Sequence, residues 1–224
     1  EIEVPPSIRL NVVISDNSVN PNTIENTYGY PVYYRGNVSV QEHVNSCIRE
    51  SKASRFMLVH DDDIICPNIL TKIEPYLSNS EYEGYTIVGR SQIFTVDTEQ
   101  TTERFGTFTT IRRPSVEEFL LELFVKKGSN YPAFPAYVYH KDNCNLLNSD
   151  ISKGGRFSDV SMLMSLYSAQ KIIWLPVDTY FYRLHNQNDG HVTDIPSMLS
   201  LVYFIARYKI NPVTKILTVV YLTK

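Results

Sequence analysis

Hydrophobic and polar positions along the first 80 residues predict strands and helices in alternation. Apolar, β-branched runs at 8–15 and 55–60 indicate two buried strands. Apolar residues at helical spacing in 39–53, and a proline-initiated segment at 67–77, indicate two helices. Because strands that alternate with helices usually pair in parallel through crossover connections, this pattern predicts a mostly parallel, Rossmann-like sheet flanked by helices.

After residue 80, strands and helices alternate less regularly. Strands are expected at 134–141 and at 172–185, the latter broken at Pro176, and one strand, or two joined by a turn, at 85–97. A strand or an extended loop is expected at 101–113, and helices at 115–128, 159–171 and 197–208. Capping boxes mark the starts of two helices, at Ser39 with Glu42 and at Ser115 with Glu118. We therefore expect one α/β domain with an irregular second half.

Composition excludes several classes of protein. The 224 residues are 43% hydrophobic and 20% charged, which is typical of a globular chain. The net charge of −3 and the scattered basic residues argue against nucleic acid as a partner. Three cysteines without a C-x-x-C pair favour a reducing, cytoplasmic location.

The apolar segment at 197–222 bears on membrane contact. It contains no run of eighteen apolar residues, so no spanning helix is expected. A buried helix is the simpler interpretation. Peripheral contact with the cytoplasmic face of a membrane is the alternative.

Carboxylates follow both predicted strands of the first half. Asp61, Asp62 and Asp63 come directly after the strand at 55–60, and Asp16 follows the strand at 8–15. Adjacent like charges at the end of a buried strand require a positive partner, and Mg²⁺ or Mn²⁺ bridging a diphosphate would supply it. Parallel strands would bring all four carboxylates to one edge of the sheet. The plainer alternatives are a solvated acidic loop and an Asx turn at Asp16.

Two later segments contain further polar candidates. Asp159 begins a predicted helix, where it could act as a general base or, like Ser158, serve as an ordinary N-cap. Arg183, His185 and His191 lie in a polar segment that could hold phosphate oxygens or a metal, or could be a simple loop.

Taken in order, these segments resemble the GT-A glycosyltransferases, in particular the inverting family 2, over residues 8–190. The resemblance implies a nucleotide-sugar-binding half at 1–95, an acceptor-binding and catalytic half at 96–195, and a C-terminal helical segment at 196–224. The family opens with a strand that contacts the nucleotide, and nothing before residue 8 supplies it. Either that strand is missing from this chain or the nucleotide pocket is built differently.

The resemblance also assigns roles to individual residues. The family's Asp-x-Asp metal motif falls on 60–62, with His60 in place of its first Asp and Asp62 as the main ligand. Asp159 takes the position of the catalytic base, after Ser158 in place of the usual Glu. The other implied contacts are to the metal from Asp61, Asp63 and His185, and to the donor from Asp16, Asn17, Asn45, Asp61 and Arg183.

The implied reaction is transfer of a sugar from a nucleotide-diphosphate sugar to a hydroxyl of a glycan or lipid-linked glycan. It would depend on Mg²⁺ or Mn²⁺, proceed with inversion and belong to polysaccharide biosynthesis. Two alternatives stay open. One is a sugar-phosphate nucleotidyltransferase, and the other is a catalytically inactive sugar- or nucleotide-binding module.

Overall fold

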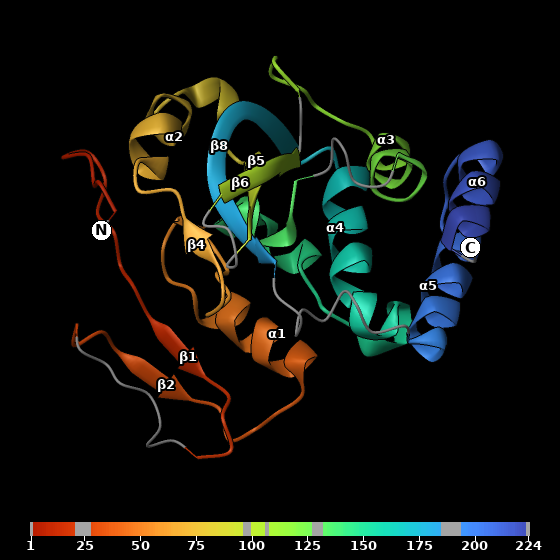
Figure 1. Ribbon diagram of the computed structural model, residues 1–224, viewed down its shortest axis with the longest axis horizontal. Helices are drawn as coiled ribbons and strands as arrows, with labels where there is room; N and C mark the ends of the chain where they lie inside the picture. Colours follow the sequence, from red (N-terminus) through yellow and green to blue (C-terminus); the bar gives the residue numbers. More distant parts are fainter. Residues whose placement is uncertain are drawn as a thin grey trace.

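A mixed, curled sheet with helices on both faces forms the centre of the molecule (Figure 1). The computed structural model describes residues 2–20, 28–95, 100–105, 108–126, 132–184 and 194–222. The strand order is β3-β7-β5-β8-β4, and β6 pairs with β5. These strands are β3 (Arg55–Phe56), β4 (Ile64–Ile65), β5 (Thr86–Thr95), β6 (Gln100–Phe105), β7 (Tyr137–His140) and β8 (Ile172–Leu184). The predicted α/β class is confirmed.

The direction of strand pairing differs from the mostly parallel sheet that the sequence predicts. The two longest strands, β5 and β8, pair in parallel, whereas the pairs β3–β7, β4–β8, β5–β6 and β5–β7 are antiparallel. Hydrophobic periodicity identifies a strand but does not report the direction of its neighbour. That direction depends on pairing between distant segments, such as Thr86 with Ile172.

Strand β8 is continuous through Pro176, where the sequence predicts a break. The register between β5 and β8 shifts between Val88 and Arg90, so Pro176 falls in a bulge. A bulge tolerates proline because its residues need not donate to the ladder. After the shift, Arg90 Nε donates to Asp178 Oδ1 at 2.8 Å, and this ion pair joins the two strands.

A second, two-stranded sheet lies apart from the main one. It consists of β1 (Ile14–Asp16) and β2 (Val32–Tyr34), paired in parallel. The prediction of a long buried strand at 8–15 is wrong, since residues 8–13 are outside any strand and Val13 is 52% exposed. The expectation that Asp16 shares a sheet edge with Asp61–Asp63 is wrong as well.

The segment before the acidic turn also differs from the prediction. The strand expected at 55–60 is reduced to the two residues of β3, and residues 57–60 lie outside any strand. The β3 and β4 strands stand at opposite ends of the strand order. The connection from 57 to 63, which contains the carboxylates, therefore links one edge of the sheet to the other.

The helices of the structure agree closely with those predicted from the sequence. Ser39 and Ser115 accept the N-cap hydrogen bonds from the backbone N–H groups of Glu42 and Glu118, as their capping boxes predict. The helix that starts after Ser115 changes to a π-helical turn, η2 (Leu121–Val125). The α-helices are α1 (Val40–Glu50), α2 (Ile69–Leu77), α3 (Val116–Leu120), α4 (Ser158–Ser168), α5 (Ile195–Arg207) and α6 (Pro212–Leu222). Short 3₁₀ turns are η1 (Ser80–Tyr82), η3 (Phe134–Ala136), η4 (Lys141–Leu146), η5 (Ile151–Lys153) and η6 (Gly155–Phe157).

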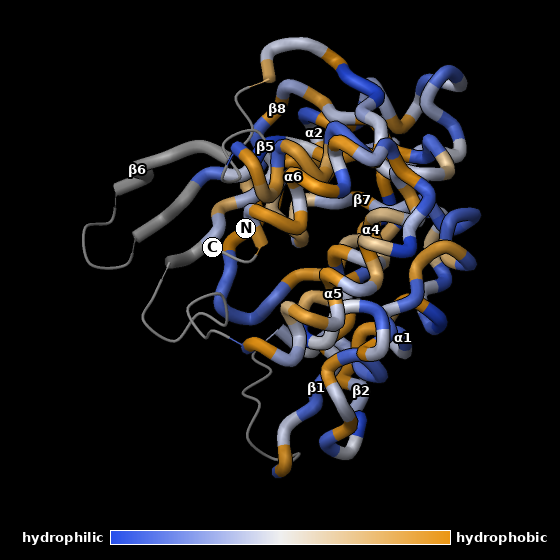
Figure 2. Tube along the Cα trace, turned by 90° about the vertical axis from the view of Figure 1, so that its right-hand side faces the viewer, coloured by the Kyte–Doolittle hydropathy of each residue, from blue (hydrophilic) through white to orange (hydrophobic). Residues whose placement is uncertain are grey.

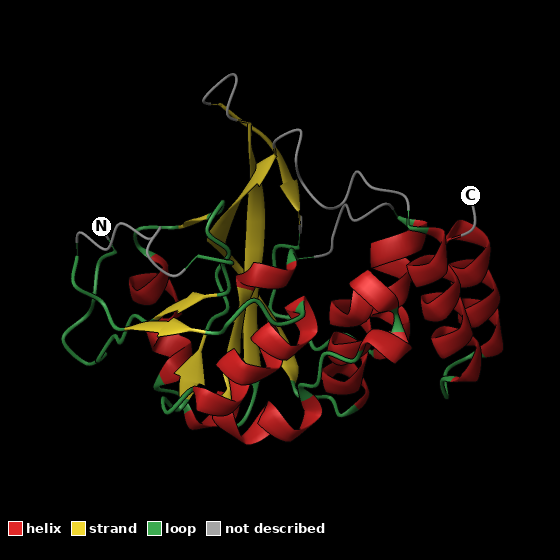
Figure 3. Ribbon diagram, turned by 90° about the horizontal axis from the view of Figure 1, so that it is seen from below, coloured by secondary structure: helices red, strands yellow, loops and turns green. Residues whose placement is uncertain are grey.

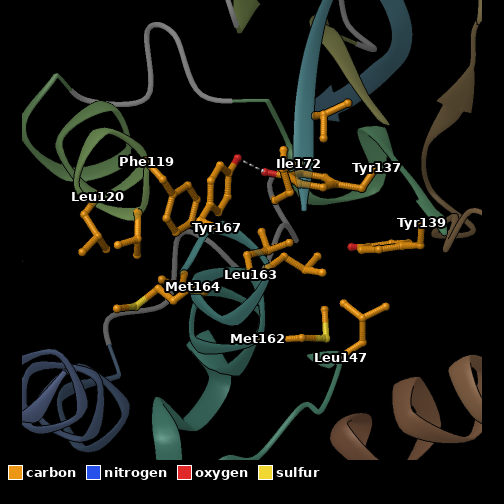
Figure 4. Packing of buried hydrophobic residues seen from close by; sticks show 14 of the residues in the cluster. Phe119, Leu120, Tyr137, Tyr139, Leu147, Met162, Leu163, Met164, Tyr167 and Ile172 are labelled. Atoms are coloured by element: carbon orange, nitrogen blue, oxygen red, sulfur yellow. Dashed lines mark hydrogen bonds between the residues drawn. The ribbon is translucent and has the colours of Figure 1, made fainter. Parts of the chain in front are cut away.

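Two hydrophobic clusters fill the two faces of the sheet. Consecutive strand residues point to opposite faces, so Ile173 belongs to the smaller cluster under α2 and Trp174 to the larger one. The larger cluster is covered by α1, α3, α4 and α5. Figure 4 shows its centre, where Phe119 stacks on Tyr167 at 4.2 Å between ring centroids and the hydroxyls of Tyr137 and Tyr167 bond at 2.8 Å.

Candidate metal and active site

The acidic segment forms a tight turn at the start of β4. The Asp63 N–H donates to the His60 carbonyl at 3.4 Å, which closes the turn. Directly after the turn, Ile64 and Ile65 pair with Phe181 and Tyr180 of β8. The turn is therefore attached to a central strand of the sheet through β4.

Three side chains of this turn converge. The potential ligand atoms of His60, Asp62 and Asp63 all lie within 4.8 Å of one another. The Asp63 side chain is 1% exposed and that of His60 is 52% exposed, and His60 Nδ1 lies 3.7 Å from Asp63 Oδ2. Asp61 is exposed and lies outside this group. Two carboxylates and one imidazole are a donor set that fits a divalent cation such as Mn²⁺.

Tyr180 forms the buried wall behind the carboxylates. It lies on β8 and is fully buried. Burial raises the pKa of Tyr180, and the neighbouring carboxylates of Asp63 and Asp62 raise it further because they repel a phenolate. Tyr180 therefore stays a neutral phenol against Asp63. The sequence did not single out this residue, because a tyrosine in an apolar strand is usually a core residue.

Asp159 lies within electrostatic range of His60 in the same turn. It occupies the first turn of α4 and is partly buried. Burial raises the pKa of the Asp159 carboxyl, while the N–H groups of Val160 and Asp159 and the His60 imidazole act in the other direction. His60 is thus near both the acidic pair and Asp159. The structure thus brings Asp159 within electrostatic range of His60, although the two are nearly 100 residues apart in sequence.

Aromatic side chains line the space around His60 and Asp159. The His60 ring stacks on Phe134 with 6.2 Å between centroids, and Phe134 lies 6.4 Å from Tyr139. Burial raises the pKa of Tyr139 well above its usual value, and the nearby Asp159 contributes to the rise. Phe134 and Tyr139 were not predicted as site residues, since nothing local in the sequence separates them from core aromatics.

A chain of hydrogen bonds holds the start of α4 against α1. Asn45 Nδ2 donates to the Ser149 carbonyl at 2.8 Å, and the Ser149 N–H donates to Asn45 Oδ1 at 2.8 Å. Ser149 Oγ in turn lies 2.8 Å from Ser158 Oγ, next to Asp159. Ser158 is the first helical residue and not the N-cap, which is Phe157. Asn45 thus positions the backbone beside Asp159, and its contact with the donor stays a prediction.

Asp16, the last residue of β1, lies in a second polar cluster. Its Oδ1 accepts from the Ser18 N–H at 2.8 Å, which is the Asx turn that the sequence offered as an alternative. Its Oδ2 is buried, and among the described residues it has no hydrogen-bond partner. Burial lowers the pKa of His43 and Arg35 lowers it further, whereas Asp16 opposes both effects. A buried carboxylate oxygen of this kind can accept a hydrogen bond from a ligand.

The structure says less about the predicted roles of Asn17, Arg183, His185 and His191. Both polar atoms of the Asn17 side chain bond the backbone of Val38 at 2.8 Å, so Asn17 holds the connection between β2 and α1. Arg183 lies near the end of β8, and its side chain is outside the described part of the chain. His185 and His191 also fall outside the described residues. The roles assigned to these residues stay predictions.

Comparison with known proteins identifies the fold. No protein-family model and no curated protein matches the chain. Residues 1–349 of Staphylococcus aureus TarS, solved in complex with UDP, are similar with a TM-score of 0.62 and 12% identity. That match covers 99% of this chain and 63% of the TarS fragment. A longer TarS structure is similar with a TM-score of 0.61 and 12% identity, over 96% of this chain and 37% of that one.

This chain therefore spans less than two thirds of the TarS chains that it resembles. At 12% identity, the similarity shows the fold alone. That fold is the one the sequence resemblance implied, a GT-A-like α/β fold with a curled sheet flanked by helices.

Proposed function

We propose that the protein is a glycosyltransferase that uses a nucleotide-diphosphate sugar as donor. The observation that carries this proposal is the convergence of His60, Asp62 and Asp63 in one turn, with the partly buried Asp159 within electrostatic range of His60. A metal-ligating group next to a separate carboxylate base provides the two functions that sugar transfer to a hydroxyl needs. The GT-A-like fold, shared with a TarS structure that contains UDP, supports the same conclusion.

His60, Asp62 and Asp63 would hold a divalent cation. When bound, such a cation neutralises charge on the leaving diphosphate. The imidazole nitrogen of His60 favours Mn²⁺ over Mg²⁺, because Mg²⁺ prefers oxygen ligands. Asp61, which is exposed beside this group, would contact the ribose or complete the metal shell, and Arg183 and His185 would close over the diphosphate.

Asp159 would act as the general base. It would take the proton from an acceptor hydroxyl, whose oxygen then attacks the anomeric carbon from the face opposite the diphosphate, which inverts that carbon. Burial makes the Asp159 carboxylate more basic than an exposed one, and this suits proton abstraction. The acceptor would be a glycan or a lipid-linked glycan, in polysaccharide biosynthesis.

Asp16 would bind the nucleotide base, and Asn17 and Asn45 would contact the donor. The buried Oδ2 of Asp16 would accept a hydrogen bond from a ring N–H of the base. The separate β1–β2 sheet would then form part of the nucleotide pocket.

Titration calorimetry with UDP, in the presence and absence of Mn²⁺, tests the donor site. We expect Asp62→Ala to abolish the Mn²⁺-dependent part of UDP binding, because it removes a ligand of the metal. Asp142→Ala is the matched control, since that side chain is 80% exposed on η4. Unchanged Mn²⁺-dependent binding in Asp62→Ala would disprove the metal assignment.

A turnover assay with UDP-sugars tests the catalytic assignment. Asp159→Asn should keep UDP binding but lower the rate of sugar transfer or donor hydrolysis by about 10²–10⁴-fold. Near-normal turnover in this variant would remove Asp159 from the mechanism. UDP binding by the wild-type protein without turnover of any sugar donor would favour the binding-module alternative. Formation of a nucleotide sugar from a nucleoside triphosphate and a sugar phosphate would favour the nucleotidyltransferase.

A further inference from the structure

The C-terminal helix α6 has its polar and apolar sides reversed relative to an ordinary surface helix. It buries Thr214 and Thr218, which are 7% and 0% exposed. Every exposed residue of α6 is apolar, and Val213 and Ile216 are 65% and 63% exposed. Because a surface helix normally turns its apolar side to the core, this reversal indicates that the outer side of α6 contacts something other than water.

Helix α5, which packs against α6, also has exposed apolar residues. Ile195, Leu199 and Tyr203 are four residues apart, so they lie along one side of the helix, and all three are more than half exposed. The opposite side of α5 buries Leu201 and Ile205 in the core. The two helices pack together at the end of the molecule farthest from the sheet (Figure 3), and much of both is hydrophobic (Figure 2). We call the following residues the C-terminal apolar face: Ile195, Leu199, Tyr203, Val213, Ile216, Leu217, Val220 and Tyr221.

Basic residues lie at the C-terminal end of α5, whereas the acidic Asp194 caps its N-terminal end and bonds Ser197. From residue 195 onward the sequence contains four basic residues and no acidic one, although the whole chain has a net charge of −3. Those residues are Arg207, Lys209, Lys215, whose Nζ donates to the Ala206 carbonyl at 2.8 Å, and Lys224, which lies outside the described residues. Arg207 and Lys209 are exposed, and the guanidinium of Arg207 lies 3.7 Å from the ring centroid of Tyr203. Cationic groups thus border an apolar surface.

The length of the helices decides how they could meet a membrane. Helix α5 has 13 residues and α6 has 11. At about 1.5 Å per residue, each is shorter than the roughly 30 Å of a hydrocarbon core. Accordingly, none of the helices in the described part of the chain is long and apolar enough to cross a membrane. A pair of short helices with an apolar side and basic borders suits the interface instead.

We propose that the C-terminal apolar face docks the protein on a membrane surface that contains anionic lipids. The apolar side chains would enter the boundary between headgroups and acyl chains, and the basic residues would contact anionic headgroups. A second copy of the chain fits this face less well, because a symmetric contact would bring the basic borders of both copies together. The proposal goes beyond the transferase function, and its test requires neither donor nor turnover.

Co-sedimentation of residues 1–224 with vesicles tests the proposal. The wild-type protein should sediment with vesicles of phosphatidylcholine and phosphatidylglycerol, more weakly with phosphatidylcholine alone, and less as salt is raised. The combined variant Leu199→Ser, Val213→Ser and Ile216→Ser should lower the partition coefficient at least about tenfold, because each change removes apolar area from the contact. Arg207→Gln and Lys209→Gln should each lower binding to the anionic vesicles about fivefold.

The matched control is one variant that combines Val19→Ser, Val40→Ser and Ile151→Ser. These three apolar residues are exposed to a similar extent but lie outside the C-terminal apolar face. This variant should bind vesicles like the wild type, and circular dichroism should show both combined variants folded. The proposal is overturned if the wild type does not bind anionic vesicles, or if both combined variants bind equally. It is also overturned if sedimentation velocity shows a dimer that only the α5–α6 variant dissociates, without vesicle binding, because the face would then join two copies.

Discussion

Burial of Asp159 has opposite consequences for activity and for stability. A carboxyl whose pKa is raised by folding binds its proton more tightly in the folded state than in the unfolded one. Its favourable contribution is complete below the unfolded pKa of about 3.9 and is lost as pH rises through the folded pKa. At neutral pH, burial of the Asp159 carboxyl therefore costs the metal-free protein stability, which is consistent with retention of a costly group for function.

Asp159→Asn should accordingly keep or raise the free energy of unfolding at neutral pH, even as it removes the proposed base. The neutral amide avoids the cost of burying a charge. Urea denaturation of the metal-free variant and wild type, at neutral pH and near pH 4, measures the effect. The advantage of the variant should shrink at the acidic pH. A variant that is clearly less stable than the wild type at neutral pH would contradict this account.

Single residues of the site were predictable to different degrees. Asp62 and Asp63 were predictable because they belong to a run of adjacent carboxylates next to an apolar segment. Such a run needs a positive partner when the segment is buried. Tyr180 and Phe134 were not predictable, because they became part of the site only through the pairing of β4 with β8 and the stacking of Phe134 on His60. Asn45 was singled out for donor binding, yet its amide bonds the backbone of Ser149.

At the level of elements, the glycines before α4 determine how closely α5 can approach it. Gly155 has φ +59°, and a Cβ at this position would overlap the side chain of Ser197 on α5. Ser197 Oγ also accepts a hydrogen bond from the Arg156 N–H at 2.9 Å, which fixes the contact between η6 and α5. The close approach of these two elements thus requires a residue without a side chain.

We expect Gly155→Ala to destabilise the protein more than Gly84→Ala. Both residues have left-handed backbone, which costs alanine about 1–2 kcal/mol, but a Cβ at Gly84 would meet nothing within 4 Å. The overlap with Ser197 should add about 1–3 kcal/mol to the cost at Gly155. Urea denaturation of the two variants gives the difference directly. If both variants lost the same free energy of unfolding, α5 could move away from residue 155 without cost.

At the level of the whole molecule, both hydrophobic clusters depend on the same strands. Ile87 and Val88 of β5 point into different clusters, as do Ile173 and Trp174 of β8. Loss of either cluster would therefore disrupt the sheet that the other one needs. For this reason we expect residues 1–224 to unfold as one domain.

Fluorescence of Trp174 provides the measurement, since it is the single tryptophan and is fully buried. Urea transitions followed by Trp174 fluorescence and by far-ultraviolet circular dichroism should share one midpoint. Phe119→Ala, which removes a ring stacked on Tyr167, should lower the free energy of unfolding by about 3–5 kcal/mol and shift both transitions together. Two separate midpoints would instead divide the chain into independent units.

The sequence by itself determined the α/β class, the helices with their caps at Ser39 and Ser115, and the acidic residues of the candidate metal site. Capping, periodicity and charge repulsion act between near neighbours, so they can be read locally. Only the tertiary structure decided the mixed direction of the sheet, the separation of Asp16 from Asp62, and the approach of Asp159 to His60. These depend on which distant segments pack together, because strand pairing and side-chain contacts join residues far apart in the chain.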